Sequence, residues 1–534
     1  MFQQQLFQQL VRTARGRRTA SPLQRMMALA GMVAFTFTTL MPQAVWAQEA
    51  GADDQKILHV LNRLTYGPRP GDADDVKSMG IEKFIQLQLH PESIPMPQDL
   101  AAYLQSNESI NTGALEMFQQ YGPPAIKAAA DAQKTGNDIE DRQLKQQVQR
   151  KNYQKLYSEA AGARLRRAVE SPRQLQEVMT DFWFNHFNVS ADKGLCHLWI
   201  GDYEQDAIRP YCMGKFRDLV EATSHHPAML FYLDNWQNTK ASDAAPGNGK
   251  SKFKGLNENF ARELMELHTL GVDGGYTQQD VIQLAKVLTG LGLPPGRGGQ
   301  RVGAGGHIEK FGAYFDPARH DFSDKVLLGV TIKGTGEQEI EQAIDLLCHQ
   351  PATAHHISYQ LAQYFVADEP PKTLVDKLTK KYEQTDGDIR AMLDEIFHSP
   401  EFWDKKYASA KFKNPYRYVV SSLRAANVAL EDYKPVLGFC ALLGMPTYRC
   451  LTPDGYKNTQ VAWLSGDTIL QRIQFATGLG SGKLPNNPLD PLKSQDVDKA
   501  VSGIFTQSTL DVVAQAPPPL KASLLLGSPE FMNY

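Results

Sequence analysis

Apolar residues recur at helical spacing along most of this chain, whereas the alternating pattern of strands is scarce. From Val281 to Leu288, for example, apolar residues return every three or four positions, and Gly290 ends the run. Such spacing places the apolar side chains on one face of an α-helix. Residues 325–332 are the best candidate for a short strand. The pattern predicts a mainly α fold: a large helical domain with long loops and at most a few short strands.

Several helix starts are indicated by a capping side chain followed by proline. Ser171-Pro172 and Asn414-Pro415 each precede a helical pattern, and the sequence Ser-Pro-Glu-Phe occurs at residues 399–402 and again at 528–531. Serine and asparagine accept hydrogen bonds from the free N–H groups of a first turn, and proline suits the first helical position. We therefore expect a helix to begin at each of these prolines.

A polar segment of mixed charge, residues 133–157, has a helical composition beyond Gly136 but little apolar stripe. A helix without an apolar stripe has no face to bury against a core. We expect this segment to project into the solvent or to contact a partner.

The first 47 residues have the layout of a secretory signal peptide. Five arginines between Arg12 and Arg25 precede an apolar stretch, residues 26–41, and the pattern Ala44-Val45-Trp46-Ala47 is typical of a cleavage site. An uncleaved anchor is the alternative, but the stretch is shorter than the ~20 residues of a spanning helix. We expect cleavage before Gln48, a periplasmic or extracellular location, and no membrane span after cleavage.

The remaining residues, 48–534, are expected to form a single helical domain. A loop rich in Gly, Ser, Lys and Asn near residues 238–255 leaves a division into two lobes open. The whole chain has a net charge of −3, and the part after residue 47 has 51 basic and 59 acidic residues, a net charge of −8. This mildly acidic composition argues against nucleic acid as the main partner.

Five cysteines follow the predicted signal peptide: Cys196, Cys212, Cys348, Cys440 and Cys450. An oxidising compartment permits disulfides, and the pairs nearest in sequence, Cys196–Cys212 and Cys440–Cys450, are the simplest prediction. None of the cysteines forms a Cys-x-x-Cys pair, so a zinc ribbon is not indicated.

Several segments resemble the large bacterial family catalogued as domain of unknown function 1800. The strongest is Asn-Glu-Asn-Phe-Ala-Arg-Glu-Leu-Met-Glu-Leu-His at residues 257–268, and the others are residues 61–67, 182–187, 227–235 and 319–322. The resemblance extends from Ile57 to the end of the sequence. It implies a mainly helical, exported protein of unassigned activity. Members of this family are often encoded beside a second exported family that resembles sulfatases and phosphatases, which implies an exported sulfatase-like partner.

Two histidines at apolar positions of predicted helices are candidates for chemistry. On a helix over residues 257–271, His268 shares a face with Phe260 and Leu264, and His186 has the same kind of position on its own helix. Core histidines that only form structural hydrogen bonds are the alternative. With nearby acidic residues, such histidines have the ligand types of a mononuclear metal site or of an acid/base pair. The candidate catalytic residues are His186, Glu263, His268, His320 and Asp321.

A divalent metal is the candidate cofactor, although no His-Glu-x-x-His spacing supports zinc. Glu258, Arg262 and Glu266 are spaced four residues apart and predict a solvated ladder of ion pairs. Asn259, Glu263 and Glu266 share a flank of the same helix. The alternative for the two glutamates of this flank is that another element covers it and that they bind a metal or transfer protons.

Calcium binding is a further hypothesis for residues 269–280, which have the length of a calcium-binding loop. Thr269 and Gly271 stand at its first and third positions, so two carboxylate ligands are missing. The simpler interpretation is that Thr277 caps the next helix and Asp280 completes a capping box.

No Gly-x-Ser-x-Gly elbow and no phosphate-binding glycine loop occurs in the sequence. We expect an exported protein with a hydrolase-like activity on extracytoplasmic polysaccharide or its substituents. The alternative is a non-catalytic binding or assembly protein that works with an exported sulfatase-like partner.

Overall fold

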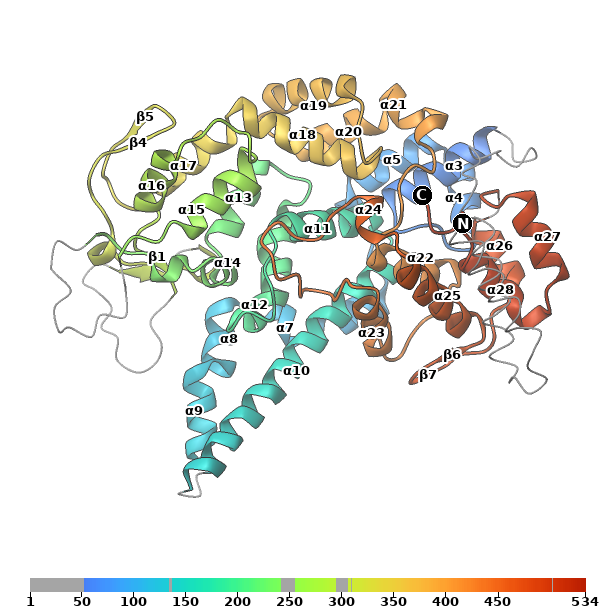
Figure 1. Cartoon of the computed structure of the whole chain (residues 1–534), viewed down its shortest axis with the longest axis horizontal. Coiled ribbons are helices and arrows are strands. Elements are labelled where there is room, and N and C mark those ends of the chain that lie inside the picture. Colours follow the sequence, from blue (N-terminus) through green and yellow to red (C-terminus); the bar gives the residue numbers. More distant parts are fainter. Residues whose placement is uncertain (1–51, 134–136, 242–254, 294–305, 309, 502) are drawn as a thin grey trace, which may run out of the picture.

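Helices make up most of the computed structural model, which describes residues 52–133, 137–241, 255–293, 306–308, 310–501 and 503–534 (Figure 1). The prediction of a mainly α fold is confirmed. Residues 1–47, the predicted signal peptide, lie outside the described residues, as does most of the predicted loop at 238–255. Within the described part, most buried apolar side chains from Ile57 to Met532 form one large core, and a small separate cluster contains Leu100, Leu104, Ile110 and Ala163.

The N-terminal part is a series of short helices followed by one long helix. In chain order these are α3 (Ala52–Leu64), α4 (Asp72–Met79), α5 (Ile81–Leu89), η1 (Pro91–Ser93), α6 (Gln98–Gln105), α7 (Glu108–Asn111), α8 (Ala114–Tyr121), α9 (Pro123–Asp131) and α10 (Asp138–Glu170).

The middle part contains two π-helical turns, η2 and η5. Its helical elements are α11 (Gln174–His186), α12 (Cys196–Asp202), η2 (Tyr203–Ile208), η3 (Arg209–Tyr211), α13 (Phe216–Ser224), α14 (Pro227–Tyr232), η4 (Asn235–Gln237), α15 (Asn259–Glu263), η5 (Leu264–Thr269), α16 (Gln278–Val287), η6 (Lys310–Gly312) and η7 (Pro317–Arg319).

The C-terminal part returns to the N-terminal helices, since α5 packs against both α11 and α20. Its helices are α17 (Gln338–Cys348), α18 (Pro351–Phe365), α19 (Lys372–Thr385), α20 (Ile389–Phe397), α21 (Pro400–Trp403), η8 (Lys405–Tyr407), α22 (Pro415–Ala425), α23 (Lys434–Leu442), α24 (Gln460–Trp463), α25 (Gly466–Gly480), α26 (Ser494–Val501), α27 (Gln507–Gln515) and α28 (Pro518–Leu526).

The strands are short and antiparallel. They are β1 (Leu291–Gly292), β2 (His307–Ile308), β3 (Tyr314–Phe315), β4 (Lys325–Leu327), β5 (Val330–Ile332), β6 (Lys483–Leu484) and β7 (Asn487–Pro488), paired in the orders β1-β3-β2, β4-β5 and β6-β7. The prediction of one strand over residues 325–332 is therefore wrong. Leu328 and Gly329 have φ angles of 49° and 79°, and two successive positive φ angles reverse the chain into a hairpin.

Two of the predicted helix starts are confirmed by their caps. The side chain of Asn414 accepts a hydrogen bond from the N–H of Arg417, and that of Ser399 accepts one from Phe402. The start expected at Ser171-Pro172 is displaced, and α11 begins at Gln174. The N–H of Ser171 still bonds to the carbonyl of Arg167, so this serine ends α10 instead of opening α11.

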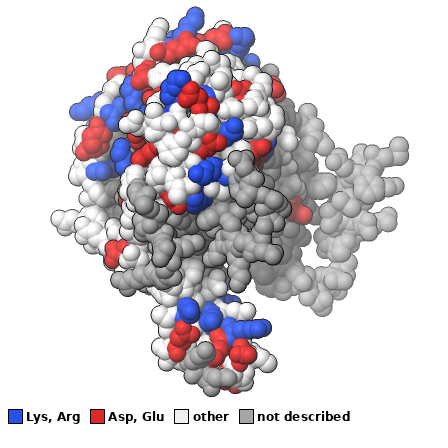
Figure 2. All heavy atoms as spheres, turned by 90° about the vertical axis from the view of Figure 1, so that its left-hand side faces the viewer, with Lys and Arg blue, Asp and Glu red and all other residues white. Residues whose placement is uncertain are grey.

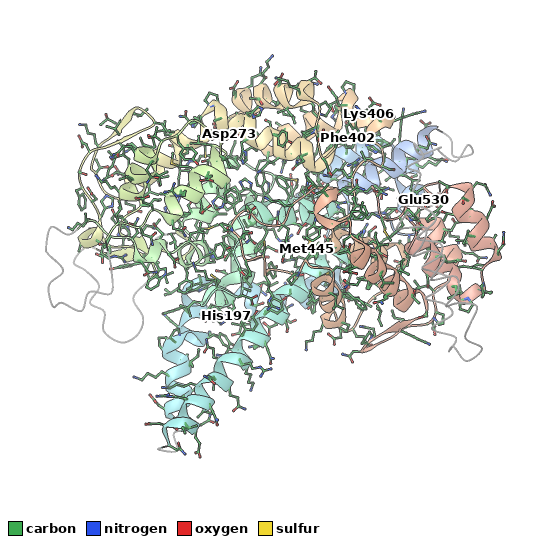
Figure 3. The ribbon with its side chains drawn as sticks, viewed as in Figure 1. His197, Asp273, Phe402, Lys406, Met445 and Glu530 are labelled. Atoms are coloured by element: carbon green, nitrogen blue, oxygen red, sulfur yellow. The ribbon has the colours of Figure 1, made fainter. Side chains whose placement is uncertain are left out.

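The two Ser-Pro-Glu-Phe sequences form similar turns after helices of equal length. Helices α20 and α28 have nine residues each. Ser399 accepts from the N–H of Phe402 and Ser528 from that of Phe531, both at 3.2 Å. Phe402 and Glu530 mark the two turns in Figure 3, where they lie at separate places in the molecule. Only the first turn continues into a short helix.

Helices α9 and α10 form an arm that projects from the body of the molecule (Figure 1). Helix α10 has 33 residues, and its first buried side chain is Leu156. On the face seen in Figure 2, basic and acidic side chains are interspersed, on the body and at the tip of the arm. The helix predicted beyond Gly136 and its projection into solvent are thus confirmed, whereas contact with a partner stays a prediction.

Buried ion pairs hold the inner half of α10 in the body. Arg164 pairs with Asp181 of α11 and with Glu204 of η2. Arg209 pairs with the same Glu204 at 3.3 Å and with Glu177 at 2.9 Å. Removing one member would leave a buried charge without its partner, which is strongly destabilising.

All five cysteines are free and buried, so the predicted disulfides Cys196–Cys212 and Cys440–Cys450 are wrong. The Sγ of Cys196 points to the carbonyl of Ala228, and the Sγ of Cys212 points to that of Gln176. Burial raises the pKa of the Cys212 thiol to about 11 and that of Cys440 to about 12. Such thiols remain protonated at neutral pH.

Candidate functional site

The segment Asn257–His268 folds into α15 and the π-turn η5 rather than into the one regular helix expected from the sequence. The hydroxyl of Thr269 donates to the carbonyl of Leu264, five residues earlier, at 2.7 Å. In a π-turn the backbone N–H groups bond to the carbonyl five residues earlier instead of four, which shifts the helix faces that follow. The hydroxyl of Thr269 adds a side-chain hydrogen bond with the same spacing. Leu267 is half-buried, whereas Met265 and His268 are buried.

His268 lies in the core with an unpartnered ring nitrogen. Its side chain is 1% exposed, and its Nε2 has no hydrogen-bond partner among the described residues. Burial lowers the pKa of this imidazole well below its usual value, and the neighbouring His186 and His356 lower it further. His268 is therefore neutral at physiological pH.

His186, the last residue of α11, is hydrogen-bonded to the π-turn. Burial lowers its pKa to about 4, so the ring is neutral at pH 7. Its Nε2 lies 3.1 Å from the carbonyl oxygen of His268, and this nitrogen must therefore carry the proton and donate. The ring centroids of the two histidines are 5.9 Å apart.

Gln360 of α18 connects His186 to a third histidine. Its side-chain amide lies 2.7 Å from Nδ1 of His186 and 3.0 Å from Nε2 of His356. The amide oxygen of Gln360 faces Nδ1 of His186 and its amide nitrogen faces Nε2 of His356. The two amide atoms are assigned from the hydrogen-bond network, and exchanging them lets Nδ1 of the neutral His186 accept from the amide nitrogen. His356 Nε2 also lies 3.3 Å from the carbonyl oxygen of Leu267. These side chains hold the π-turn by its backbone.

Two further carboxyl groups, those of Glu266 and Asp454, act electrostatically on Glu263 at the end of α15. Glu263 is half-buried, and its pKa is raised by burial and by the negative charges of Glu266 and Asp454. Partial burial acts to raise the pKa of Asp454 as well, but hydrogen bonds from Lys457 and Thr452 outweigh it and lower that pKa. The surroundings thus move the pKa of Glu263 upward and that of Asp454 downward.

Asn185 fixes the loop that carries Asp454. Its side-chain amide donates to the carbonyl of Tyr456 at 2.8 Å and accepts from the N–H of the same residue at 2.7 Å. A Cβ at Gly455 would lie 2.2 Å from the backbone oxygen of Asn185, and φ of Gly455 is +65°. Only glycine fits there. The adjacent Asn185 and His186 therefore hold the loop and the π-turn, respectively.

The part of the chain that matches a known protein family includes the whole site. The family model described as protein of unknown function (DUF1800) matches residues 59–533. The chain belongs to the DUF1800 family. No curated protein and no solved structure matches it. In this DUF1800 protein, no helix of the described residues is long and apolar enough to cross a membrane.

His320 and Asp321 of the DUF1800 protein belong to a second hydrogen-bonded group. Nδ1 of His320 lies 2.7 Å from the carbonyl of Thr289, and its Nε2 lies 3.1 Å from the carboxylate of Glu339. Lys325, also fully buried, pairs with Glu339 at 2.5 Å. The side chain of Asp321 accepts from the N–H and the hydroxyl of Ser323. The structure thus brings His186, Glu263 and His268 to one turn. His320 and Asp321 instead bond to Glu339 and Ser323, respectively.

The capping box at the start of α16 is confirmed. Asp280 Oδ2 accepts from the N–H and hydroxyl of Thr277, and Oδ1 accepts from Leu328 at 2.7 Å. Asp273, labelled in Figure 3, lies in the preceding turn. In the described ranges, no three His, Cys, Asp or Glu side chains are grouped as ligands of a metal ion.

Sequence reasoning missed Asp454, His356 and Gln360. The Asp454-Gly455 dipeptide indicates a turn, but nothing in its spacing connects it to Glu263. Glu266 was predicted as part of an exposed ladder, and it instead accepts a hydrogen bond from the hydroxyl of Tyr276 at 3.0 Å. The ion pair predicted between Glu258 and Arg262 is present at 3.1 Å.

Proposed function

We propose that this DUF1800 protein is a hydrolase-like enzyme that acts outside the cytoplasm on a polysaccharide or its substituents. The observation that carries the proposal is the opposite displacement of two neighbouring carboxyl pKa values, upward for Glu263 and downward for Asp454. Environments that separate the pKa values of two acids mark a general acid and its partner. The location rests on the predicted signal peptide.

In this mechanism Glu263 is the general acid. Its protonated carboxyl donates to the leaving oxygen of the substrate, and the ionised Asp454 acts as base towards water or as nucleophile. His186 donates to the carbonyl of His268 and so positions the turn that carries Glu263. Asn185 positions the loop of Asp454.

The test is an assay of released reducing ends, acyl groups and sulfate on a panel of polysaccharides. Glu263→Gln and Asp454→Asn should each lower the rate by about 10²- to 10⁴-fold, the usual contribution of one proton-transfer group. Glu258→Gln is the matched control, because Glu258 pairs with Arg262 near the same turn. If the two site variants hydrolyse as fast as the control, the assignment is wrong.

The projecting arm supports a second candidate function, the binding of an exported sulfatase-like partner. Its outer half is a polar helix with no buried side chain before Leu156. Reversing the exposed charges Arg142, Lys145 and Lys151 to Glu should abolish a stoichiometric complex with such a protein after co-expression. Lys372→Glu, at a side chain 85% exposed on α19, is the control. A complex that survives the triple reversal would contradict docking on the arm.

A further inference from the structure

A cleft of about 680 Å³ lies between α6, the inner half of α10 and residues 430–437. This is the volume range of small-ligand sites. Its lining includes Tyr103, Gln154, Ser158, Arg166 and Tyr433, and none of its lining residues belongs to the carboxylate group around Glu263.

Gly162 forms part of the cleft wall in the middle of α10. Glycine in a helix interior is destabilising by about 1 kcal/mol relative to alanine. A Cβ at this position would meet only the hydroxyl of Tyr103, at 3.1 Å. This distance is shorter than an ordinary van der Waals contact, so the missing side chain lets Tyr103 approach the backbone of α10 at the cleft wall.

Arg166 is held rigidly in the same cleft. Its Nε donates to both oxygens of Glu170 at 3.0 Å, and its guanidinium carbon lies 4.3 Å from the centre of the Tyr103 ring. The hydroxyl of Tyr433 donates to Glu170 at 2.8 Å. The terminal nitrogens of Arg166 have no hydrogen-bond partner among the described residues. These donors are preorganised and free to bind a ligand.

The charges of the cleft balance. Its lining contains three cations, Lys155, Arg166 and Lys434, and three carboxyl groups, Glu159, Glu431 and Asp432. An anionic ligand would meet three like charges, and so would a cationic one. A neutral ligand with many hydroxyl groups can instead donate to the carboxylates and accept from the cations. The two tyrosines add flat apolar surface.

We propose that this cleft binds a neutral segment of a polysaccharide chain, as a binding site separate from the hydrolytic carboxyl groups. The choice of a saccharide rests on the proposed function, whereas a neutral ligand is chosen because the lining has as many carboxyl groups as cations. Two of these cations are also paired with glutamates outside the lining, Lys155 with Glu108 and Arg166 with Glu170. Such a site would hold a long substrate on the protein while its scissile bond reaches Glu263 and Asp454.

The experiment measures binding of cellohexaose, xylohexaose and maltohexaose to the full mature chain by calorimetry. At least one hexasaccharide should bind, and Gly162→Gln, whose side chain must displace Tyr103 at the cleft wall, should weaken its binding at least tenfold. Gly438→Gln is the matched control, because Gly438 is also helical and has nothing within 4 Å of its added Cβ. Circular dichroism establishes that both variants are folded.

The outcomes separate this site from the proposed catalysis. Hexasaccharide binding that persists in Glu263→Gln but is lost in Gly162→Gln supports the cleft, even if no hydrolysis is found. A binding constant that does not change between 0.05 and 0.5 M salt supports a neutral ligand. No binding of any of the three hexasaccharides, or equal binding by Gly162→Gln and Gly438→Gln, overturns the inference.

Discussion

Glu263 is half-buried beside two further carboxyl groups, and this environment opposes its ionisation in the folded protein. Because its folded pKa is raised, the unfolded chain loses this proton first as the pH rises. Stability contributed by the protonated form is therefore lost from about the ordinary pKa of 4.5 upward. A functional group of this kind is held at a cost to stability.

We predict that Glu263→Gln raises the melting temperature at pH 7.5 and changes it little at pH 4. The neutral amide removes a charge that the folded state disfavours at the higher pH only. Thermal denaturation of the wild-type and variant proteins at both pH values measures the difference. A difference in melting temperature, variant minus wild type, that is more negative at pH 7.5 than at pH 4 would contradict the raised pKa of Glu263.

The sequence alone indicates some members of the site and not others. His186 and His268 stand out because a polar ring occupies an apolar helical position, and the structure places their ring centroids 5.9 Å apart. Asp454 could not be found in this way. It comes from a loop whose place depends on Asn185, and side-chain to backbone bonds between distant segments leave no periodic signal in a sequence.

At the scale of elements, the caps were predictable and the π-turn was not. Capping depends on a serine or asparagine next to its own helix, as at Ser399 and Asn414. A π-turn needs one additional residue within a turn, and helical spacing is nearly the same with or without it. The sequence therefore predicts Leu267 and His268 on one buried face, whereas in the structure His268 is buried and Leu267 is only half-buried.

We predict that Ser399→Ala lowers the free energy of unfolding by about 1 kcal/mol, the usual effect of losing an N-cap side chain. Ser528→Ala should have an effect of about the same size, because it removes a buried side-chain hydrogen bond of the same geometry. Each serine accepts one N–H at 3.2 Å and would leave it unsatisfied. Urea denaturation measures the change. Ser323→Ala, on an exposed loop, should have a smaller effect, and equal losses at all three sites would count against the capping argument.

For the whole molecule, buried neutral histidines set the response to acid. Burial lowers the pKa of His59 to about 3 and the pKa values of His186 and His225 to about 4. Between pH 6.5 and 4 the unfolded chain binds these protons and the folded chain does not. Stability therefore falls as the pH falls through this range.

We predict a steep loss of stability from pH 6.5 to 4, of which His186 contributes about 3 kcal/mol. His186→Gln should flatten the pH dependence of unfolding by urea. His349→Gln replaces a histidine whose side chain is 61% exposed and should leave the slope unchanged. Identical slopes for the two variants would show that His186 is not held neutral.

The five free cysteines also give a prediction for the whole molecule. Thiolate is the reactive form, and burial both covers these thiols and raises their pKa values. Labelling with a thiol reagent should be negligible in the native protein and should reach five groups in denaturant without a reductant. Fewer than five would indicate disulfides in the isolated protein.

Helix α10 joins three parts of this molecule in a single rod of about 50 Å. Its outer half forms the arm, Gly162 and Arg166 border the cleft, and Arg164 carries the buried ion pairs. The helix is uninterrupted, so a load on the tip acts as a lever with its fulcrum at Arg164. A force applied to the arm would therefore be transmitted to the cleft wall. Tension on a bound polymer would in the same way be transmitted to the tip of the arm.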